Sequence, residues 1–280
     1  MKLERRQAIT KIIGITGAAA GSVLLPSSLQ AQEMAGDNML TPADLQNLEY
    51  AKLDAMAVAK LAYDADVRNK GCMYQVFHAI VTKLAESSSP DAAKFAAIPT
   101  ALSIYGSGGI FGQGTICGNN NAAGMLLKLL KVPNAEGKNG QIVGAIYRYY
   151  ESTPLPYMDD EFVTGIGANP EDTATKVVAA SVAKSFMCHS SISNWSDASG
   201  LNAKQKGERC QRLSASMAHY IVTLLNRIVD GEDVDLAAIS LPEGSAGECV
   251  ECHGTSYTFG DAPSTMTGMD CVTCHTGHFN

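Results

Sequence analysis

The sequence has few aromatic residues, little charge and no hydrophobic run that makes a convincing membrane span. Phe, Trp and Tyr together make up 6% of its 280 residues, and charged residues make up 18%. Alanine and glycine are plentiful, which suits close-packed helices better than the aromatic and β-branched core of a β-sandwich. A hydrophobic content of 46% is ordinary for a globular protein and argues against extensive disorder. We therefore predict a mainly α-helical fold.

Basic residues are missing from the C-terminal end of the chain. No lysine or arginine follows Arg227, although acidic residues continue as far as Asp270, and the formal net charge of the whole chain is −7. Nucleic acid is bound mainly through positive charge on the protein. We therefore expect no nucleic-acid partner.

Residues 1–31 have the features of an export signal. Arg5 and Arg6 form a twin arginine, residues 12–25 are a mild apolar run, and a small-residue cleavage site follows. An ordinary secretory signal is the alternative, because Ala8 stands where the twin-arginine pattern prefers phenylalanine. The apolar run is short and rich in glycine, so we expect no membrane span in the mature chain. Both routes of export predict a periplasmic protein.

Two Cys-x-x-Cys-His motifs near the C-terminus indicate the chemistry of the chain. Two thiols three positions apart can add to the vinyl groups of one porphyrin, and the histidine that follows can ligate its iron. A zinc ribbon also uses paired Cys-x-x-Cys motifs, but the histidine in both motifs and the export signal favour haem. We predict two haem c groups, attached through Cys249, Cys252, Cys271 and Cys274, with His253 and His275 as the proximal iron ligands.

Four other histidines could be distal haem ligands, although a surface or core histidine is the alternative for each. His278 follows His275 so closely that it can reach only the other haem or a haem of a partner subunit. His219 lies opposite the apolar stripe of its predicted helix and could offer a ligand to a docked group. His189 adjoins Cys188 and is expected near that cysteine. We predict two bis-histidine haems with His278 and His219 as distal ligands, and with His78 in reserve.

Apolar residues recur with helical period through most of the chain. The predicted helices cover residues 41–68, 72–85, 120–131, 141–151, 171–186 and 203–229, with a short helical piece before Tyr105. Residues 159–161 are interpreted as a solvated acidic patch. The pattern weakens after Asp230. We therefore divide the chain into a signal peptide (1–31), a helical domain (32–230), and a linker with an irregular dihaem segment (231–280).

A glycine-rich stretch, residues 106–118, interrupts the helical pattern. It lacks the Gly-Lys-Ser/Thr ending of a P-loop and follows no predicted strand, so nucleotide binding is not expected. Its glycines either adopt positive φ and allow close packing, or their N–H groups surround an anion or a cluster.

Four cysteines lie outside the haem motifs, namely Cys72, Cys117, Cys188 and Cys210. Their spacing matches no ferredoxin pattern. Spacing therefore leaves open inert thiols, two disulfides, or a four-thiolate metal site. The first two stand at predicted helix starts, where the helix dipole stabilises a thiolate.

The surroundings of these cysteines resemble the C-GCAxxG-C-C family of redox proteins over about residues 66–226. The resemblance is carried by Gly71-Cys72, by Gly114-Thr115-Ile116-Cys117-Gly118, by residues 188–195 and by residues 208–213. One departure is Asn119-Asn120-Asn121, where that family prefers small residues. With its two haem motifs, the whole chain resembles the split-Soret cytochrome c family. This resemblance implies an iron–sulfur cluster on the four cysteines, and a homodimer whose haems cluster at one end.

These features predict an electron carrier with two haems and a cluster, and with no substrate of its own. One alternative is a haem reductase or oxidase in which one haem keeps an open axial position. Another is a thiol redox sensor that uses the four scattered cysteines as disulfides. No Ser/His/Asp or paired-carboxylate arrangement in the sequence indicates an enzyme.

Overall fold

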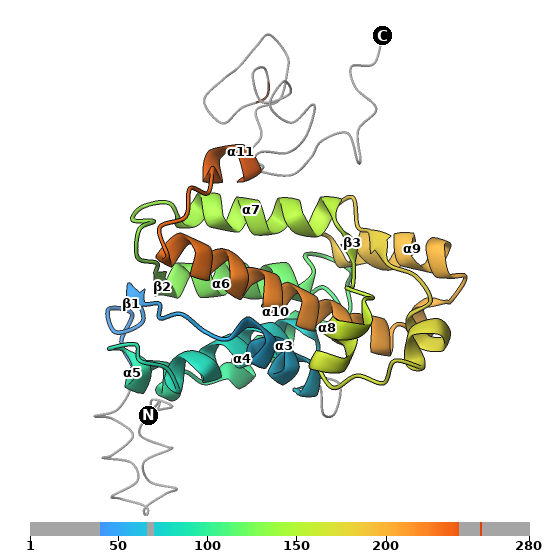
Figure 1. Cartoon of the computed structure of the whole chain (residues 1–280), viewed down its shortest axis with the longest axis horizontal. Coiled ribbons are helices and arrows are strands. Elements are labelled where there is room, and N and C mark those ends of the chain that lie inside the picture. Colours follow the sequence, from blue (N-terminus) through green and yellow to red (C-terminus); the bar gives the residue numbers. More distant parts are fainter. Residues whose placement is uncertain (1–39, 66–69, 241–252, 254–280) are drawn as a thin grey trace, which may run out of the picture. The chain divides into compact units, whose positions relative to one another are not determined.

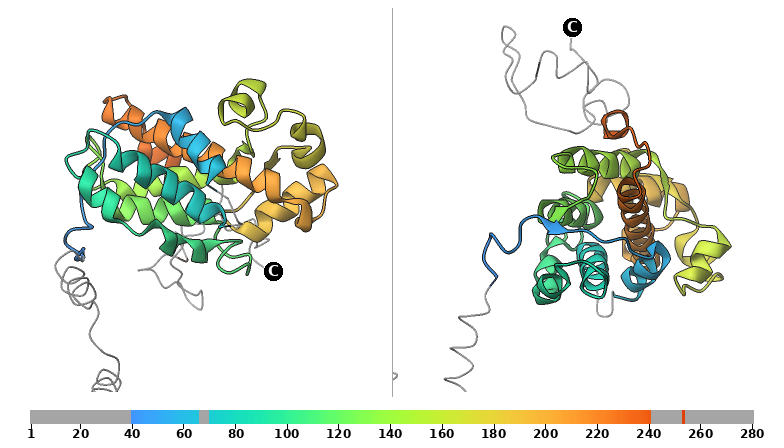
Figure 2. Two further views of the ribbon diagram at one scale, coloured as in Figure 1. Left: turned by 90° about the horizontal axis from the view of Figure 1, so that it is seen from below. Right: turned by 60° about the vertical axis from the view of Figure 1, so that its left-hand side comes forward.

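Helix α10 (Gly207–Val229) is the element around which the other helices are arranged. The computed structural model describes residues 40–65, 70–240 and 253. All of these except residues 40 and 41 belong to one compact unit, which begins at Pro42. Helix α10 contacts α3 (Ala55–Asp64), α4 (Cys72–Ala85), α6 (Gly118–Leu129) and α7 (Asn139–Ser152) (Figure 1). Figure 2 shows α3 lying alongside α10. The predicted mainly helical fold is confirmed.

The apolar stripe predicted along α10 forms part of the main core. Its apolar members are all buried, namely Leu213, Met217, Ile221, Leu224 and Ile228. Each buried side chain of this size contributes about 1.5–3 kcal/mol to folding. Cys210, the first residue of the same stripe, is half-buried.

Shorter elements connect these helices. They are α5 (Ala92–Ala97), η1 (Thr100–Gly106), α8 (Asp160–Gly165), η2 (Thr173–Val177), α9 (Cys188–Ser199), η3 (Ala203–Gln205) and α11 (Leu236–Ser240). Two pairs of short strands hold the connections together. Strand β1 (Leu48–Glu49) pairs in parallel with β2 (Leu130–Lys131), and β3 (Pro154–Leu155) pairs antiparallel with β4 (Ser181–Val182).

Three helix predictions agree closely with the structure. The helix predicted at 72–85 has those bounds in α4, and the one at 141–151 corresponds to α7. The helix predicted at 120–131 corresponds to α6, which ends two residues earlier. It ends there because Leu130 has an extended backbone and pairs with Leu48.

The first predicted helix is much shorter than expected. Helix α3 begins only at Ala55, because the Asp54 side chain accepts hydrogen bonds from the N–H groups of Met56 and Ala57 and caps the helix there. Among the preceding residues, Leu48 is not helical, because it belongs to β1 and pairs with Leu130 of β2. Periodicity alone does not distinguish such a buried strand from a continuing helix.

The helix predicted at 171–186 is wrong. Only one π-helical turn, η2, forms there, and Val178 follows it with φ of 65°. The indole N–H of Trp195 donates to the Val177 carbonyl at 2.8 Å, which holds the chain in this turn. The segment then enters β4, so tertiary pairing replaces local helical propensity.

The predicted acidic patch, residues 159–161, is exposed as expected, and it also forms the start of α8. The Asp159 carboxylate accepts a hydrogen bond from the Phe162 N–H at 2.8 Å and caps the helix. Helix α8 packs on α3 and α10 through a second apolar cluster, whose buried members are Ala59, Phe162, Val163, Ile166, Ala168 and Ala215. Helix α9 was not predicted at all.

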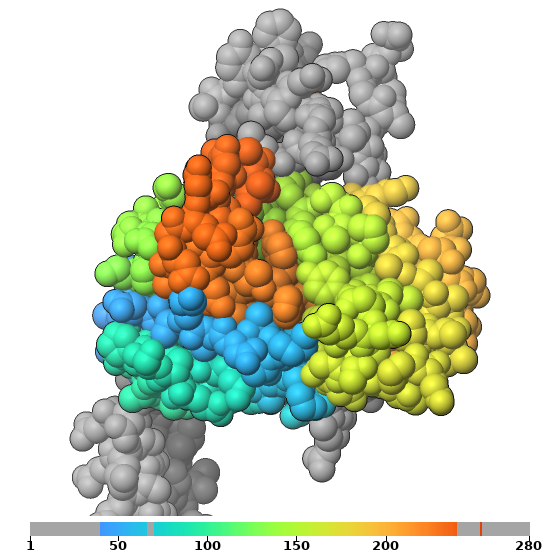
Figure 3. All heavy atoms as spheres, viewed as in Figure 1, coloured from blue at the N-terminus to red at the C-terminus, as the bar shows by residue number. Residues whose placement is uncertain are grey.

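The described chain remains part of the helical body beyond Asp230. Helix α11 contacts α7, and its Leu236 is buried in the main core. Figure 3 shows α3 (blue) and α10 (orange) side by side on one face, with the yellow-green segment that includes α8 next to them. Among the described residues, no helix is both long and apolar enough to span a membrane. The predicted signal peptide lies outside the described residues.

Candidate metal centre

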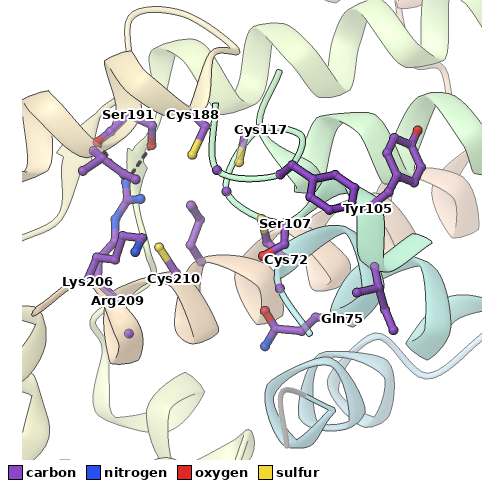
Figure 4. A pocket seen from close by; sticks show the side chains of 18 of the residues that line it. Cys72, Gln75, Tyr105, Ser107, Cys117, Cys188, Ser191, Lys206, Arg209 and Cys210 are labelled. Carbon is purple, nitrogen blue, oxygen red and sulfur yellow. Dashed lines mark hydrogen bonds between the residues drawn. The ribbon is translucent and has the colours of Figure 1, made fainter. Parts of the chain in front are cut away.

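The four cysteines outside the haem motifs line one cavity of about 560 Å³. All four are free thiols (Figure 4). Cys72 and Cys188 are the first residues of α4 and α9, Cys117 is the residue before α6, and Cys210 lies near the start of α10. Four helix starts therefore meet at one cavity, and their N-terminal dipoles favour negative charge there.

Backbone pairing brings Cys117 and Cys188 together. The residues just before them, Ile116 and Met187, form an antiparallel bridge. The Cys117 N–H donates to the Phe186 carbonyl at 2.9 Å, and the Cys188 N–H donates to the Thr115 carbonyl at 2.7 Å. This bridge fixes both cysteines at the same wall of the cavity.

Glycine is required where Cys72 approaches Cys117. A Cβ atom on Gly118 would lie 2.6 Å from the Cys72 sulfur and 2.5 Å from the Met73 nitrogen. At Gly71, where φ is 86°, a Cβ atom would lie 2.4 Å from the Ser107 hydroxyl oxygen. Within the glycine-rich stretch, Gly118 allows close packing and four glycines have positive φ, namely Gly108, Gly109, Gly112 and Gly114, in agreement with one of the two roles considered for it.

The thiols have unequal proton affinities. A hydrogen bond with Cys72, helped by the Asn119 N–H and the Arg209 charge, lowers the pKa of Cys117 to about 6. The same hydrogen bond, together with burial, raises the pKa of Cys72 well above its usual value. Burial raises the pKa of Cys188 to about 12, and it also raises the pKa of Cys210. Cys117 is therefore the thiol whose pKa is lowered, whereas the pKa values of the other three are raised.

The four sulfurs are not arranged around a single metal ion. In the part of the chain that the structure describes, no three His, Cys, Asp or Glu side chains come close enough to share one ion. The same four cysteines nevertheless line one cavity and influence each other electrostatically. The arrangement therefore suits a group that is itself several atoms across.

A buried cation, Arg209, also lines this cavity. Its side chain is 1% exposed, and it donates to the Ser191 hydroxyl at 2.8 Å (Figure 4). Its Nε atom has no hydrogen-bond partner, and none of the described carboxylates forms a salt bridge with it. An isolated buried charge is costly, so the cavity favours an anionic occupant.

Tyr150 is a second buried polar group at the cavity. Its hydroxyl lies near the Cys117 sulfur and Ser191 without making a hydrogen bond of normal geometry. No sequence motif indicated a role for Tyr150, Arg209 or Ser191. The sequence could have indicated that Arg209 is buried, because it lies four residues before Leu213 and therefore on the apolar stripe of α10.

The described histidines lie away from this cavity. His219 is half-buried, and its ring packs edge-on against Phe162 and Tyr157, so the segment containing α8 covers the helix face that was expected to be free. Burial lowers the pKa of His219. His189 is exposed, and its backbone N–H donates to the Gly114 carbonyl at 3.0 Å.

His78 is half-buried beside α5 and η1. Its Nδ1 atom lies 2.9 Å from the Thr100 hydroxyl, and its ring stacks on Tyr74 with centroids 4.8 Å apart. The haem attachment residues Cys249, Cys252, Cys271 and Cys274, together with His275 and His278, lie outside the described residues. His253 is described and half-buried.

Comparison with known proteins identifies the family. No protein-family model matches the chain. Over 278 residues it is 29% identical to the split-Soret cytochrome c of Desulfovibrio desulfuricans, covering 95% of this chain and 93% of that protein. The solved structure of the protein from strain ATCC 27774 superimposes with a TM-score of 0.64 and 31% identity, covering 81% of this chain and 90% of that one. The chain belongs to the split-Soret cytochrome c family. The solved relative is described as having a novel iron centre.

The asparagines that depart from the C-GCAxxG-C-C pattern are built into this split-Soret cytochrome fold. Asn119 and Asn120 are both fully buried. The Asn119 side-chain oxygen accepts a hydrogen bond from the Ser214 hydroxyl on α10, and the Asn120 amide donates to the Phe186 carbonyl. These bonds tie the start of α6 to α10 and to the segment before Cys188. The departure therefore supports the position of Cys117.

Proposed function

We propose that this chain is a periplasmic electron carrier that holds two bis-histidine haem c groups and an iron–sulfur cluster. The cluster would be ligated by the four cysteines that line the cavity, Cys72, Cys117, Cys188 and Cys210. A single observation carries this proposal: the fold brings four distant thiols to one cavity beside a buried arginine that has no carboxylate partner among the described residues.

The residues fit such a group in charge and in size. Iron ligated by four thiolates and inorganic sulfide is an anion, and Arg209 together with four helix N-termini provides positive potential for it. No three of the described side chains are placed to share one ion, whereas a polynuclear cluster spans a wider space. When bound, a cluster supplies reversible one-electron transfer. Ligation would also draw protons from the thiols whose pKa values burial raises.

The two haems would be attached at the Cys-x-x-Cys-His motifs, with His253 and His275 as proximal ligands. We retain His278 and His219 as the proposed distal ligands, with His78 in reserve. The His219 ring packs edge-on against Phe162 and Tyr157, so it would have to ligate iron while keeping these contacts. We also propose a homodimer, because the segment after residue 240 has few apolar side chains to cover two porphyrins.

The proposal is tested by analysing full-length, haem-loaded protein purified without oxygen. We expect two haems per chain, additional iron, and acid-labile sulfide, with both haems six-coordinate and low-spin. Two disulfides and no sulfide would instead indicate the thiol redox sensor. A high-spin haem that binds carbon monoxide would instead indicate the haem reductase or oxidase.

A further inference from the structure

Two arginines one turn apart on α10 are fully buried but differ in their surroundings. Arg212 is 0% exposed and pairs with the Glu208 carboxylate at 2.7 Å. It also donates to the Thr173 hydroxyl at 2.6 Å and to the Asn169 carbonyl at 2.8 Å. Its charge is therefore neutralised by a partner within the protein, as is usual for a buried ion.

Arg209 has no such partner among the described residues. It donates to the hydroxyl and carbonyl oxygens of Ser191, which are neutral, and its guanidinium lies 6.0 Å from the Trp195 ring. The indole is itself held by its hydrogen bond to Val177, so the surface beneath the guanidinium is fixed. The described part of the protein thus keeps the buried Arg209 charge at the cavity without a carboxylate counter-ion. A second cation, Lys206, also lines the cavity, but it is only half-buried.

This charge acts on the cavity. Arg209 lines it beside Cys210, and its guanidinium donates to the hydroxyl of Ser191, which lines the same cavity. Charges interact more strongly inside a protein than in water, because the surroundings respond less to them. A group bound by these sulfurs would therefore feel the Arg209 charge strongly.

We infer that Arg209, held in place by Ser191, is the fixed counter-charge of the iron centre and favours its reduced state. The inference rests on the proposed cluster. Reduction adds one electron to a group that is already anionic, so a nearby buried cation stabilises the reduced state more than the oxidised state. Arg209 is thus a positioning residue that raises the midpoint potential of the centre without ligating it.

The test is an anaerobic redox titration of full-length, haem-loaded protein, in which the cluster is followed by electron paramagnetic resonance and the haems by absorption. Arg209→Met removes the charge but keeps much of the side-chain volume. We expect the ratio of oxidised to reduced cluster at a fixed potential to rise about tenfold, which for one electron is a shift of about 59 mV to more negative potential. Arg209→Lys keeps the charge and should recover most of this shift.

Arg212→Met is the matched control, because it removes an equally buried arginine that is already neutralised. It should lower thermal stability but leave the potential of the cluster unchanged. Loss of the cluster from Arg209→Met, but not from Arg209→Lys or Arg212→Met, would also support the inference. If Arg209→Met does not fold, Ser191→Ala removes the 2.8 Å bond while keeping the charge, and it should shift the potential in the same direction by less.

Two results would overturn the inference, and they differ from failure of the proposed function. One is an Arg209→Met protein with full iron and sulfide and with the potential of the unsubstituted protein. The other is an equal shift in the Arg209→Met and Arg212→Met proteins, which would indicate a general effect on packing. If the unsubstituted protein contains no sulfide and no iron beyond its haems, the proposed cluster itself is wrong.

Discussion

Replacing Gly118 by alanine should separate two of the cysteines that line the cavity. The added Cβ atom would lie 2.5 Å from the Met73 nitrogen and 2.6 Å from the Cys72 sulfur. Carbon atoms do not approach other atoms so closely, and the Met73 nitrogen belongs to the backbone of α4, so relief requires the starts of α4 and α6 to move apart. The backbone of Gly118 does not have positive φ, so alanine introduces no strain of its own there.

The size of this effect follows from two opposing terms. Overpacking a well-packed core costs about 1–3 kcal/mol. Alanine recovers up to about 1 kcal/mol, because it loses less backbone entropy than glycine in a helix. The expected net loss is about 1–2 kcal/mol in the free energy of unfolding. For a protein of this size, that lowers Tm by about 2–8 °C.

The assay is thermal unfolding of full-length, haem-loaded protein followed by circular dichroism, together with iron and acid-labile sulfide analysis. Gly118→Ala should lower both Tm and the sulfide content. Gly124→Ala is the control on the same helix, because its Cβ atom would meet only the Tyr147 hydroxyl at 3.3 Å. An unchanged Tm with full sulfide content in Gly118→Ala would refute the geometric argument.

Four further predictions concern the cofactors and the assembly. Cys72→Ser should lose acid-labile sulfide and non-haem iron but keep both covalent haems, and loss of haem as well would contradict separate sites. His219→Ala or His278→Ala should each give one high-spin haem per chain in absorption spectra, with His78→Ala as the unaffected control. Because no lysine or arginine follows Arg227, both haems should have midpoint potentials below zero in a redox titration, and clearly positive values for both would argue against this. Sedimentation of the holo-protein should give about twice the mass of the mature chain, whereas a monomer with intact haem spectra would exclude the dimer.

Local sequence pattern determined much of the helical architecture. The bounds of α4 and the apolar stripe of α10 follow from residues three and four positions apart, which lie on one face of a helix whatever the rest of the chain does. The failures occurred where distant segments decide the backbone. Residues 171–186 were predicted as a helix, but the hydrogen bond from Trp195 and the pairing in β4 hold them in other conformations.

The haem sites and the cysteine cavity differ in what the sequence can determine. Each haem motif is complete within five consecutive residues, so its prediction needs no tertiary structure, and it rests on the sequence alone. The four cavity cysteines are far apart in the chain, and their spacing left three interpretations open. Only the folded chain brings them together, through the bridge between Ile116 and Met187 and the close contact at Gly118.

The role inferred for Arg209 depended on the tertiary structure, which places its side chain at the cysteine cavity. In the sequence, Glu208 stands four residues before Arg212, a spacing that favours an ion pair on a helix, whereas no acidic residue stands three or four positions from Arg209. Among the described residues, Arg212 forms an ion pair with the Glu208 carboxylate, whereas Arg209 donates hydrogen bonds to Ser191 and pairs with no carboxylate. Burial makes this difference important, because the energy of an unpaired charge depends on the groups and solvent around it rather than on its neighbours in sequence.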